Sequence, residues 1–291
     1  MTTMTDTKPS ALNAGVVKIG HFRINRMGFG AMRITGDGVW GPPADKAEAK
    51  RVLRRAVELD VNFIDTADSY GPEVSEQLIH DALYPYEGLL IATKGGMQRG
   101  GPGSWSSDGR PQHLREACEG SLKRLGINQI TLYQFHRPDP NVPFLESVRT
   151  LVDLQKEGKI RYIGLSNVAL EQLQQAMELG EIVSVQNHYN LTHRRDSDEI
   201  VDFCAEHGIA FIPYFPIGGG MSSLGEKVIQ TIATHHQATP HQIALAWLLA
   251  RSPTMLPIPG TSSVNHLEEN IAAAAIQLSD ADIAQLDSLS D

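Results

Sequence analysis

Residues 130–166, ITLYQFHRPDPNVPFLESVRTLVDLQKEGKIRYIGLS, contain two short apolar runs on either side of one amphipathic stretch. The runs at 130–136 and 160–166 are rich in β-branched and aromatic residues, which is typical of buried strands. Within residues 143–157, four apolar residues recur every three or four positions, as on one face of a helix: Phe144, Val148, Leu151 and Leu154. The segment therefore predicts a βαβ unit with parallel strands.

The same unit recurs along the whole chain. Strand-like apolar runs lie at residues 26–32, 62–67, 89–94, 130–136, 160–166, 183–189, 210–216 and 255–260. The last residues of neighbouring runs are 23 to 44 positions apart, which leaves room for one helix in each interval. Eight such units predict an α/β fold, the (β/α)8 TIM barrel, although a doubly wound sheet would use similar parts.

Further segments complete the predicted organisation. They are an N-terminal β-hairpin at residues 16–19 and 22–25 and two extra helices near residues 226–236 and 279–289. The polar residues 1–14 are interpreted as a disordered tail. Because no linker-like change of composition follows, residues 15–291 are expected to form a single barrel domain.

Composition and charge exclude several classes of protein. The 291 residues include 34 acidic and 25 basic ones, a formal net charge of −9 without any block of like charge, so nucleic acid and membrane partners are not expected. Cys118 and Cys204 are 86 positions apart, which indicates neither a disulfide framework nor a zinc site. Without an apolar signal sequence or a run of eighteen apolar residues, a cytoplasmic protein is expected.

Polar residues at the ends of consecutive strands are the candidate catalytic groups, because barrel active sites lie at the carboxyl ends of the strands. These residues are Asp65, Tyr70, Lys94 and His136. Alone, Asp65 could cap a helix, and Tyr70 or His136 could simply pack. Lys94 is harder to explain, because a buried lysine needs an opposite charge, and Asp65 lies one strand away. The combination favours catalysis over four separate structural roles.

Reduction of a carbonyl by hydride would use all four residues. Tyr70 is the candidate general acid for the oxygen, and a neighbouring Lys94 ammonium would lower the pKa of its phenol. Asp65 would keep Lys94 charged and oriented, and His136 could donate a hydrogen bond to the carbonyl oxygen. No metal is required.

The motifs at these positions resemble those of the aldo-keto reductases. The matching stretches are GFGAMR (28–33), NFIDTADSYG (62–71), IRYIGLSN (160–167), VQNHYN (185–190) and PIPGTSS (257–263). The resemblance covers nearly all of the chain after the tail and implies an NAD(P)H-dependent barrel oxidoreductase with the four residues above as its tetrad. GVWGPP (38–43), ALYPY (82–86) and YFPIGG (214–219) further resemble the bacterial branch that includes pyridoxal reductases.

Glycine spacing alone gives two misleading motifs. Gly28 and Gly30 are spaced as in a Rossmann fingerprint, but Arg33 stands at the third glycine position, and Glu226 stands where a P-loop needs lysine. The cofactor contacts implied by the resemblance are instead Ser166, Asn167 and Gln186 for the carboxamide, Tyr214 for the nicotinamide ring, Pro216, Gly218 and Gly219 near the pyrophosphate, and Gly260, Thr261, Ser262, Ser263, His266, Glu269 and Asn270 for the adenosine.

Two positions in this set depart from the family pattern. Many relatives carry an arginine at the position of His266 and a lysine at Gly260. A neutral histidine binds phosphate less strongly than an arginine does. NADPH is the expected cofactor, with NADH kept as the alternative.

The expected activity is NADPH-dependent reduction of aldehydes, with ketones as a further option. Broad small-aldehyde specificity or a pyridoxal-like substrate is expected, and the pocket candidates are Met32, Trp40, Trp105 and Tyr189. One alternative is a noncatalytic, cofactor-sensing regulatory subunit. A metal-assisted lyase would need more carboxylates and histidines at the strand ends. A monomer is expected.

Overall fold

A single curved sheet of parallel strands lies at the centre of the structure, a computed structural model that describes residues 8–216 and 223–289. Its spatial order is β11-β10-β9-β8-β5-β4-β3. In chain order these strands are β3 (Phe29–Gly30), β4 (Phe63–Asp65), β5 (Leu90–Gly95), β8 (Ile130–Phe135), β9 (Ile160–Ser166), β10 (Ile182–Gln186) and β11 (Ala210–Phe211). Chain order follows spatial order, as βαβ units with right-handed crossovers require.

An irregular segment, residues 254–258, closes the sheet into a barrel. On one side the Leu256 amide donates to the Phe211 carbonyl of β11 at 2.8 Å. On the other side the Gly28 amide, just before β3, donates to the Pro257 carbonyl at 2.9 Å. The segment bonds to both edges of the sheet and occupies the place of the eighth strand, which confirms the predicted barrel.

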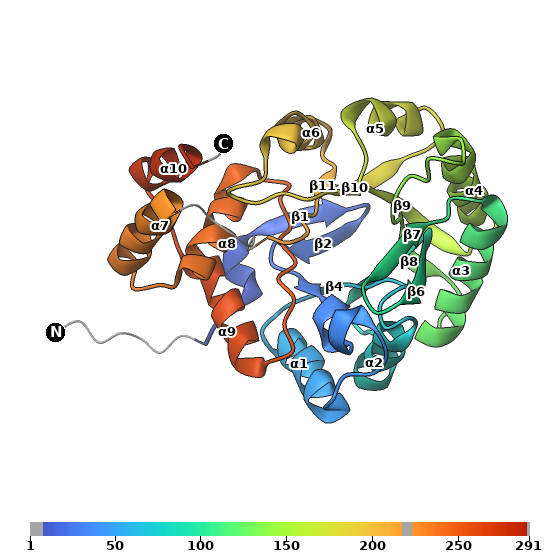
Figure 1. The fold of residues 1–291 in the computed structure, drawn as a ribbon, viewed down its shortest axis with the longest axis horizontal. Coiled ribbons are helices and arrows are strands. Elements are labelled where there is room, and N and C mark those ends of the chain that lie inside the picture. The colour runs from blue at the N-terminus through green and yellow to red at the C-terminus, as the bar shows by residue number, and fades with distance from the viewer. Residues whose placement is uncertain (1–7, 217–222, 290–291) are drawn as a thin grey trace.

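Helices surround the strands on the outside (Figure 1). They are α1 (Lys46–Glu58), α2 (Val74–Leu83), α3 (Pro111–Leu125), α4 (Phe144–Lys156), α5 (Leu170–Met177), α6 (Arg195–His207), α7 (Ser223–His235), α8 (Pro240–Arg251), α9 (Val264–Ala272) and α10 (Asp280–Asp287). Among them α7 and α10 contact each other outside the ring and correspond to the two predicted extra helices. Within the described ranges, none of these helices is long and apolar enough to span a bilayer.

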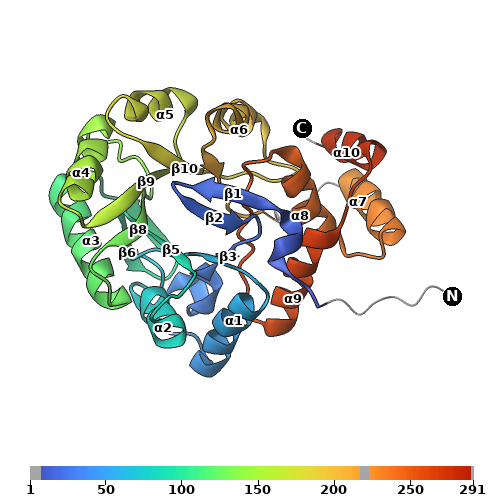
Figure 2. The same ribbon diagram turned by 180° about the vertical axis from the view of Figure 1, so that it is seen from behind.

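The N-terminal hairpin closes the amino end of the barrel. Its strands β1 (Val16–Ile19) and β2 (Phe22–Asn25) pair antiparallel and lie across the centre of the ring (Figure 2). Ile19 and Ile24 pack in one apolar cluster with residues at the starts of the barrel strands, such as Phe63. Because the amino end is plugged, the open end of the barrel is the one where the strands finish.

The segment before the hairpin differs from its prediction. Residues Ala11–Ala14 form a short 310 helix that Ser10 caps by accepting a hydrogen bond from the Leu12 amide. The Ala11 amide donates to the Leu59 carbonyl at 2.9 Å, and Ala11 and Ala14 are buried against the core. A disordered tail is therefore wrong for residues 11–14, because small apolar side chains tie them to the barrel.

A second hairpin, which the sequence analysis missed, follows β5. It consists of β6 (Met97–Gly101) and β7 (Ser104–Ser107), paired antiparallel with an irregular register. It lies in the interval of 42 positions between the ends of the third and fourth predicted strands. The extra length of that interval forms a flap at the carboxyl end of the barrel.

Candidate active site

A buried ion pair lies between the ends of two neighbouring strands. The Lys94 Nζ of β5 is 2.6 Å from the Asp65 Oδ2 of β4, and the two side chains are 0% and 2% exposed. The parallel register of β4 and β5 brings the two residues together, as the sequence predicted. Burial tends to lower the pKa of Lys94, but the Asp65 carboxylate and the Tyr70 hydroxyl outweigh it and raise the pKa, so the ammonium stays charged.

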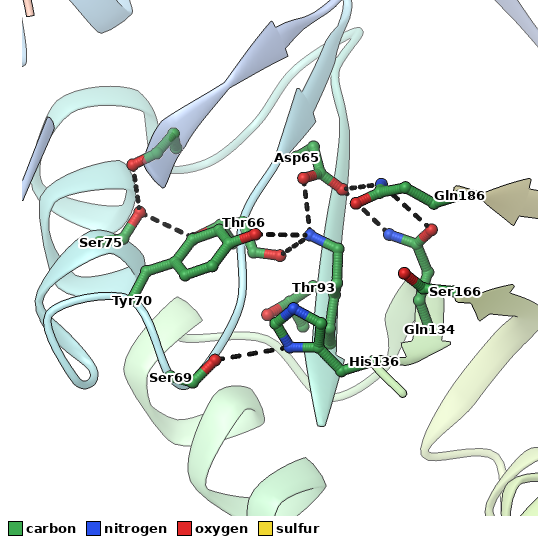
Figure 3. A network of polar contacts seen from close by, with 12 residues as sticks. Asp65, Thr66, Ser69, Tyr70, Ser75, Thr93, Gln134, His136, Ser166 and Gln186 are labelled. Carbon is green, nitrogen blue, oxygen red and sulfur yellow. Dashed lines mark hydrogen bonds and ion pairs between the residues drawn. The ribbon is translucent and has the colours of Figure 1, made fainter. Parts of the chain in front are cut away.

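Two glutamine side chains and one carbonyl hold the ion pair in place (Figure 3). The Nε2 groups of Gln134 and Gln186 both donate to Asp65 Oδ1, at 3.0 and 2.9 Å. Lys94 Nζ also donates to the Thr66 carbonyl at 2.8 Å. With these partners the buried charges keep their hydrogen bonds, which offsets much of their desolvation cost.

Gln134 was missed by the sequence analysis, although its spacing carries a signal. Leu132 belongs to the apolar cluster inside the barrel, and side chains alternate along a strand. Gln134 and His136 therefore also face inward. Two polar residues at inward positions near the end of an apolar strand indicate a buried polar network.

Tyr70 lies in the loop after β4, where its hydroxyl accepts a hydrogen bond from Lys94 Nζ at 3.3 Å. Burial raises the pKa of Tyr70 above its usual value, and the Lys94 ammonium offsets this only in part. This differs from the lowered pKa expected from the sequence, because the phenol is almost fully excluded from water. Tyr70 is therefore a protonated phenol at neutral pH.

His136 follows β8 and lies against the Tyr70 ring, with ring centroids 5.9 Å apart. Its Nδ1 is 3.4 Å from the Ser69 Oγ (Figure 3). Burial, and then the nearby Lys94 and Arg137 charges, lower the pKa of His136 well below its usual value. The imidazole is therefore neutral at pH 7 and can donate one hydrogen bond, as the prediction for this residue requires.

These groups open into one cavity of about 930 Å³ at the carboxyl end of the barrel. Of the predicted tetrad, Asp65, Tyr70 and His136 line it, and Lys94 lies behind them. The lining also includes residues that the sequence analysis did not select: Arg33, Met97, Arg137, His188, Asn190, Thr192, His193, Phe215, Ile258 and Pro259. Most of these lie within a few positions of a strand end, which is the signal that a wider search would have used.

Two of the four predicted pocket residues line this cavity. Met32 and Trp105 line the cavity. Trp40 does not line it and lies 5.6 Å from the Arg99 guanidinium instead. Tyr189 also does not line it.

Tyr189 is a core residue. Its ring stacks on Trp247 with centroids 5.9 Å apart, and the side chain is fully buried. Its hydroxyl donates to Asp198 Oδ1 at 2.6 Å and accepts from Arg251 Nε at 3.0 Å. The prediction failed because Tyr189 follows a strand end in sequence, but its side chain points outward, under α6 and α8.

Ser166, Asn167 and Tyr214 form a polar wall next to the tetrad. Asn167 Nδ2 donates to the His136 carbonyl and to Ser166 Oγ, both at 3.0 Å. Tyr214 donates to Asn167 Oδ1 at 2.7 Å, and its ring stacks on His188 at a plane angle of 9°. Amide and hydroxyl groups beside a flat aromatic ring fit a carboxamide-bearing ring such as nicotinamide.

Two glycines let the chain approach itself closely at the opposite wall. A Cβ on Gly260 would lie 2.4 Å from the Gly30 carbonyl oxygen, and a Cβ on Gly30 would lie 2.6 Å from the Ile258 carbonyl oxygen. Both glycines line the cavity, together with Pro216. A cavity wall made of backbone without side chains suits an elongated ligand with phosphate groups.

Apart from Gly260, the predicted adenosine contacts lie outside the lining of the cavity, in the three residues before α9 or in α9 itself. They are Thr261, Ser262, Ser263, His266, Glu269 and Asn270. Ser263 caps the helix by accepting from the His266 amide. A helix N-terminus favours anions. Gly218 and Gly219, predicted near the pyrophosphate, lie outside the described residues.

Comparisons with known proteins agree with this geometry. The aldo/keto reductase family profile matches residues 26–291. The chain is 48% identical over 285 residues to an uncharacterised oxidoreductase of Schizosaccharomyces pombe, covering 98% of this chain and 93% of that protein. It is 42% identical over 287 residues to pyridoxine 4-dehydrogenase of Escherichia coli, covering 96% and 99%.

A solved structure is similar over nearly the whole fold. The aldo/keto reductase of Klebsiella pneumoniae in complex with NADP and acetate matches with a TM-score of 0.78 and 26% identity, covering 94% of each chain. The sequence match and the fold thus agree over the same span. The protein is an oxidoreductase that belongs to the aldo/keto reductase family.

Proposed function

We propose that the protein reduces aldehydes to alcohols with NADPH, with Tyr70 as the general acid. The observation that carries this proposal is the chain of contacts from Asp65 to Lys94 to the Tyr70 hydroxyl, at 2.6 and 3.3 Å, which ends at the wall of the cavity. A carbonyl oxygen beside Tyr70 would meet a protonated phenol on one side and the His136 imidazole on the other.

The side chains account for the proton and for the developing charge. A bound nicotinamide would supply the hydride to the carbonyl carbon. Tyr70 donates its proton to the carbonyl oxygen, which completes the alcohol, and the adjacent Lys94 ammonium stabilises the phenolate that remains. His136 donates a hydrogen bond that orients the carbonyl. Tyr70 then regains a proton from water that enters the cavity.

NADPH is the proposed cofactor because a related structure contains NADP and because the polar wall and the glycines fit a dinucleotide. Ser166, Asn167 and Gln186 would hold the carboxamide, and Tyr214 would stack on the ring. The similarity to a pyridoxine 4-dehydrogenase makes pyridoxal-like aldehydes the first substrates to examine. Small aldehydes of other shapes come next.

The test is a substrate panel followed at the nicotinamide absorbance. Pyridoxal, benzaldehyde and short aliphatic aldehydes are each supplied with NADPH or NADH. We expect oxidation of NADPH at a higher kcat/KM than of NADH. Tight binding of NADPH without turnover of any aldehyde would contradict the proposal and favour a cofactor-sensing subunit.

A further inference from the structure

Three separate loops meet above the cavity at a single side chain. We call these loops the pocket roof: residues 37–41 after β3, the backbone of residues 69–71 after β4, and residues 97–107, which form the β6–β7 hairpin. The first two are also joined directly, because the Gly71 amide donates to the Val39 carbonyl at 3.3 Å. The side chain where all three meet is Arg99 of β6.

Every N–H group of the Arg99 guanidinium donates a hydrogen bond to a backbone carbonyl of the roof. Its Nε donates to Ser104 at 3.0 Å, its Nη1 to Val39 at 2.7 Å and to Ser69 at 3.0 Å, and its Nη2 to Gly38 at 2.8 Å and to Gly101 at 3.3 Å. A guanidinium has five such donors in a fixed planar arrangement, so the match is complete. Lysine has three donors on one atom and could not reproduce it.

The same guanidinium also lies against two indole rings. It is 3.6 Å from the ring centroid of Trp105 and 5.6 Å from that of Trp40. Trp105 in turn contacts the Tyr70 ring edge to face, with centroids 6.3 Å apart, and lines the cavity while 37% of it stays exposed. Arg99 therefore connects the two loops to the ring that stands directly over the proposed acid.

From this arrangement we propose that Arg99 is a positioning residue that fixes Trp105 as a flat aromatic ceiling over Tyr70, and that this ceiling selects ring-bearing aldehydes. The inference rests on the proposed function. A two-stranded hairpin is marginally stable by itself, so Trp105 needs an outside anchor to hold one orientation. With the indole fixed, a planar ring attached to the aldehyde can stack or meet it edge to face, whereas a saturated ring gains less.

The experiment compares benzaldehyde with cyclohexanecarbaldehyde, which have similar size but differ in aromaticity. The measured quantity is the ratio of their kcat/KM values with NADPH. In Trp105→Ala the ratio should fall about three- to tenfold. Arg99→Ala should lower it to a similar extent, chiefly through KM for benzaldehyde, and Arg99→Lys should not restore it. Added guanidinium ion should partly restore the ratio in Arg99→Ala and leave Trp105→Ala unchanged.

Arg161→Ala is the matched control. Arg161 is an exposed arginine 5.8 Å from the Phe22 ring centroid and 5.7 Å from that of Tyr162, at the opposite end of the barrel. Its removal should leave the ratio as it is. An unchanged ratio in Arg99→Ala or, should that variant fail to fold, in Arg99→Lys would overturn the role of Arg99. A wild-type protein that reduces neither of these aldehydes nor pyridoxal would instead overturn the proposed function, whereas reduction of pyridoxal alone would overturn the general preference for ring-bearing aldehydes.

Discussion

The floor and the roof of the cavity are built in different ways. The floor consists of the side chains of Asp65, Lys94, Gln134 and Gln186 near strand ends and of Tyr70 in the loop after β4, which bond to one another in the barrel. The roof consists of loops that hold together through Arg99 and its backbone acceptors. The sheet fixes the chemistry, while the loops shape the space above it. Changes to the floor should therefore affect kcat, and changes to the roof should affect substrate choice.

The largest effect is expected from Tyr70→Phe. The ring and its packing stay, but the proton donor beside Lys94 is lost, so kcat should fall by at least about a hundredfold. NADPH oxidation with benzaldehyde measures kcat, and a fluorescence titration measures cofactor affinity, which should stay within about twofold of the wild type. Unchanged turnover in this variant would show that Tyr70 is not the proton donor.

Lys94→Met should cause the next largest change, this time in stability. It leaves the Asp65 carboxylate buried without its cation, which should lower the free energy of unfolding by about 3–5 kcal/mol. Urea denaturation at pH 7 measures this loss. The double variant Asp65→Asn, Lys94→Met should recover part of the loss, because an amide oxygen can still accept from Gln134 and Gln186. Equal stability of the single and double variants would show that the two charges do not depend on each other.

The pH dependence of the reaction tests whether Tyr70, Lys94 and His136 keep their protonation states. The pKa of His136 lies well below its usual value and those of Tyr70 and Lys94 lie above theirs, so these groups change little near neutrality. Because Tyr70 must be protonated to act as an acid, its raised pKa moves the loss of activity to higher pH. For benzaldehyde reduction, kcat/KM should stay level from about pH 6 to about pH 9. An inflection near pH 6.5, the usual pKa of histidine, would contradict this and show that His136 becomes charged and that its charge affects the reaction.

Tyr189→Phe should have the smallest effect. It tests whether a core residue affects stability without affecting the floor or the roof of the cavity. It removes a hydroxyl bonded to Asp198 and Arg251, which should lower the free energy of unfolding by about 1 kcal/mol. The kinetic constants should stay within about twofold of the wild type, since the ring does not line the cavity. A large rise in KM for aldehydes would show that Tyr189 contributes to substrate binding after all.

The floor was largely predictable from the sequence because it follows from the barrel. Once the strands were recognised, residues ending neighbouring strands had to converge, and Asp65 and Lys94 do so within 2.6 Å. The side of the strand on which a residue lies was harder to predict. Tyr189 follows a strand end, but its side chain points away from the barrel interior and is buried under α6 and α8. The sign of the Tyr70 pKa shift was also missed, because a sequence shows the neighbouring lysine but not the burial that outweighs it.

The roof could not be predicted, because nothing periodic marks it. The β6–β7 hairpin is short, eight of its eleven residues are polar or glycine, and its register shifts between Arg99 and Gly101. Its position depends on contacts with residues some 30 and 60 positions earlier in the chain. Only the unusual length of the interval between two predicted strands indicated that additional structure was present there.

The close approach of Gly30 and Gly260 limits which substitutions the chain can accept during evolution. Any side chain at position 260 would begin 2.4 Å from the Gly30 carbonyl oxygen. One substitution could not introduce a side chain such as lysine there without moving β3 and residue 260 apart. Such a step would require several coordinated changes, whereas His266 at the start of α9 is exposed and can be replaced alone. Single substitutions are therefore more accessible at the start of α9 than at position 260.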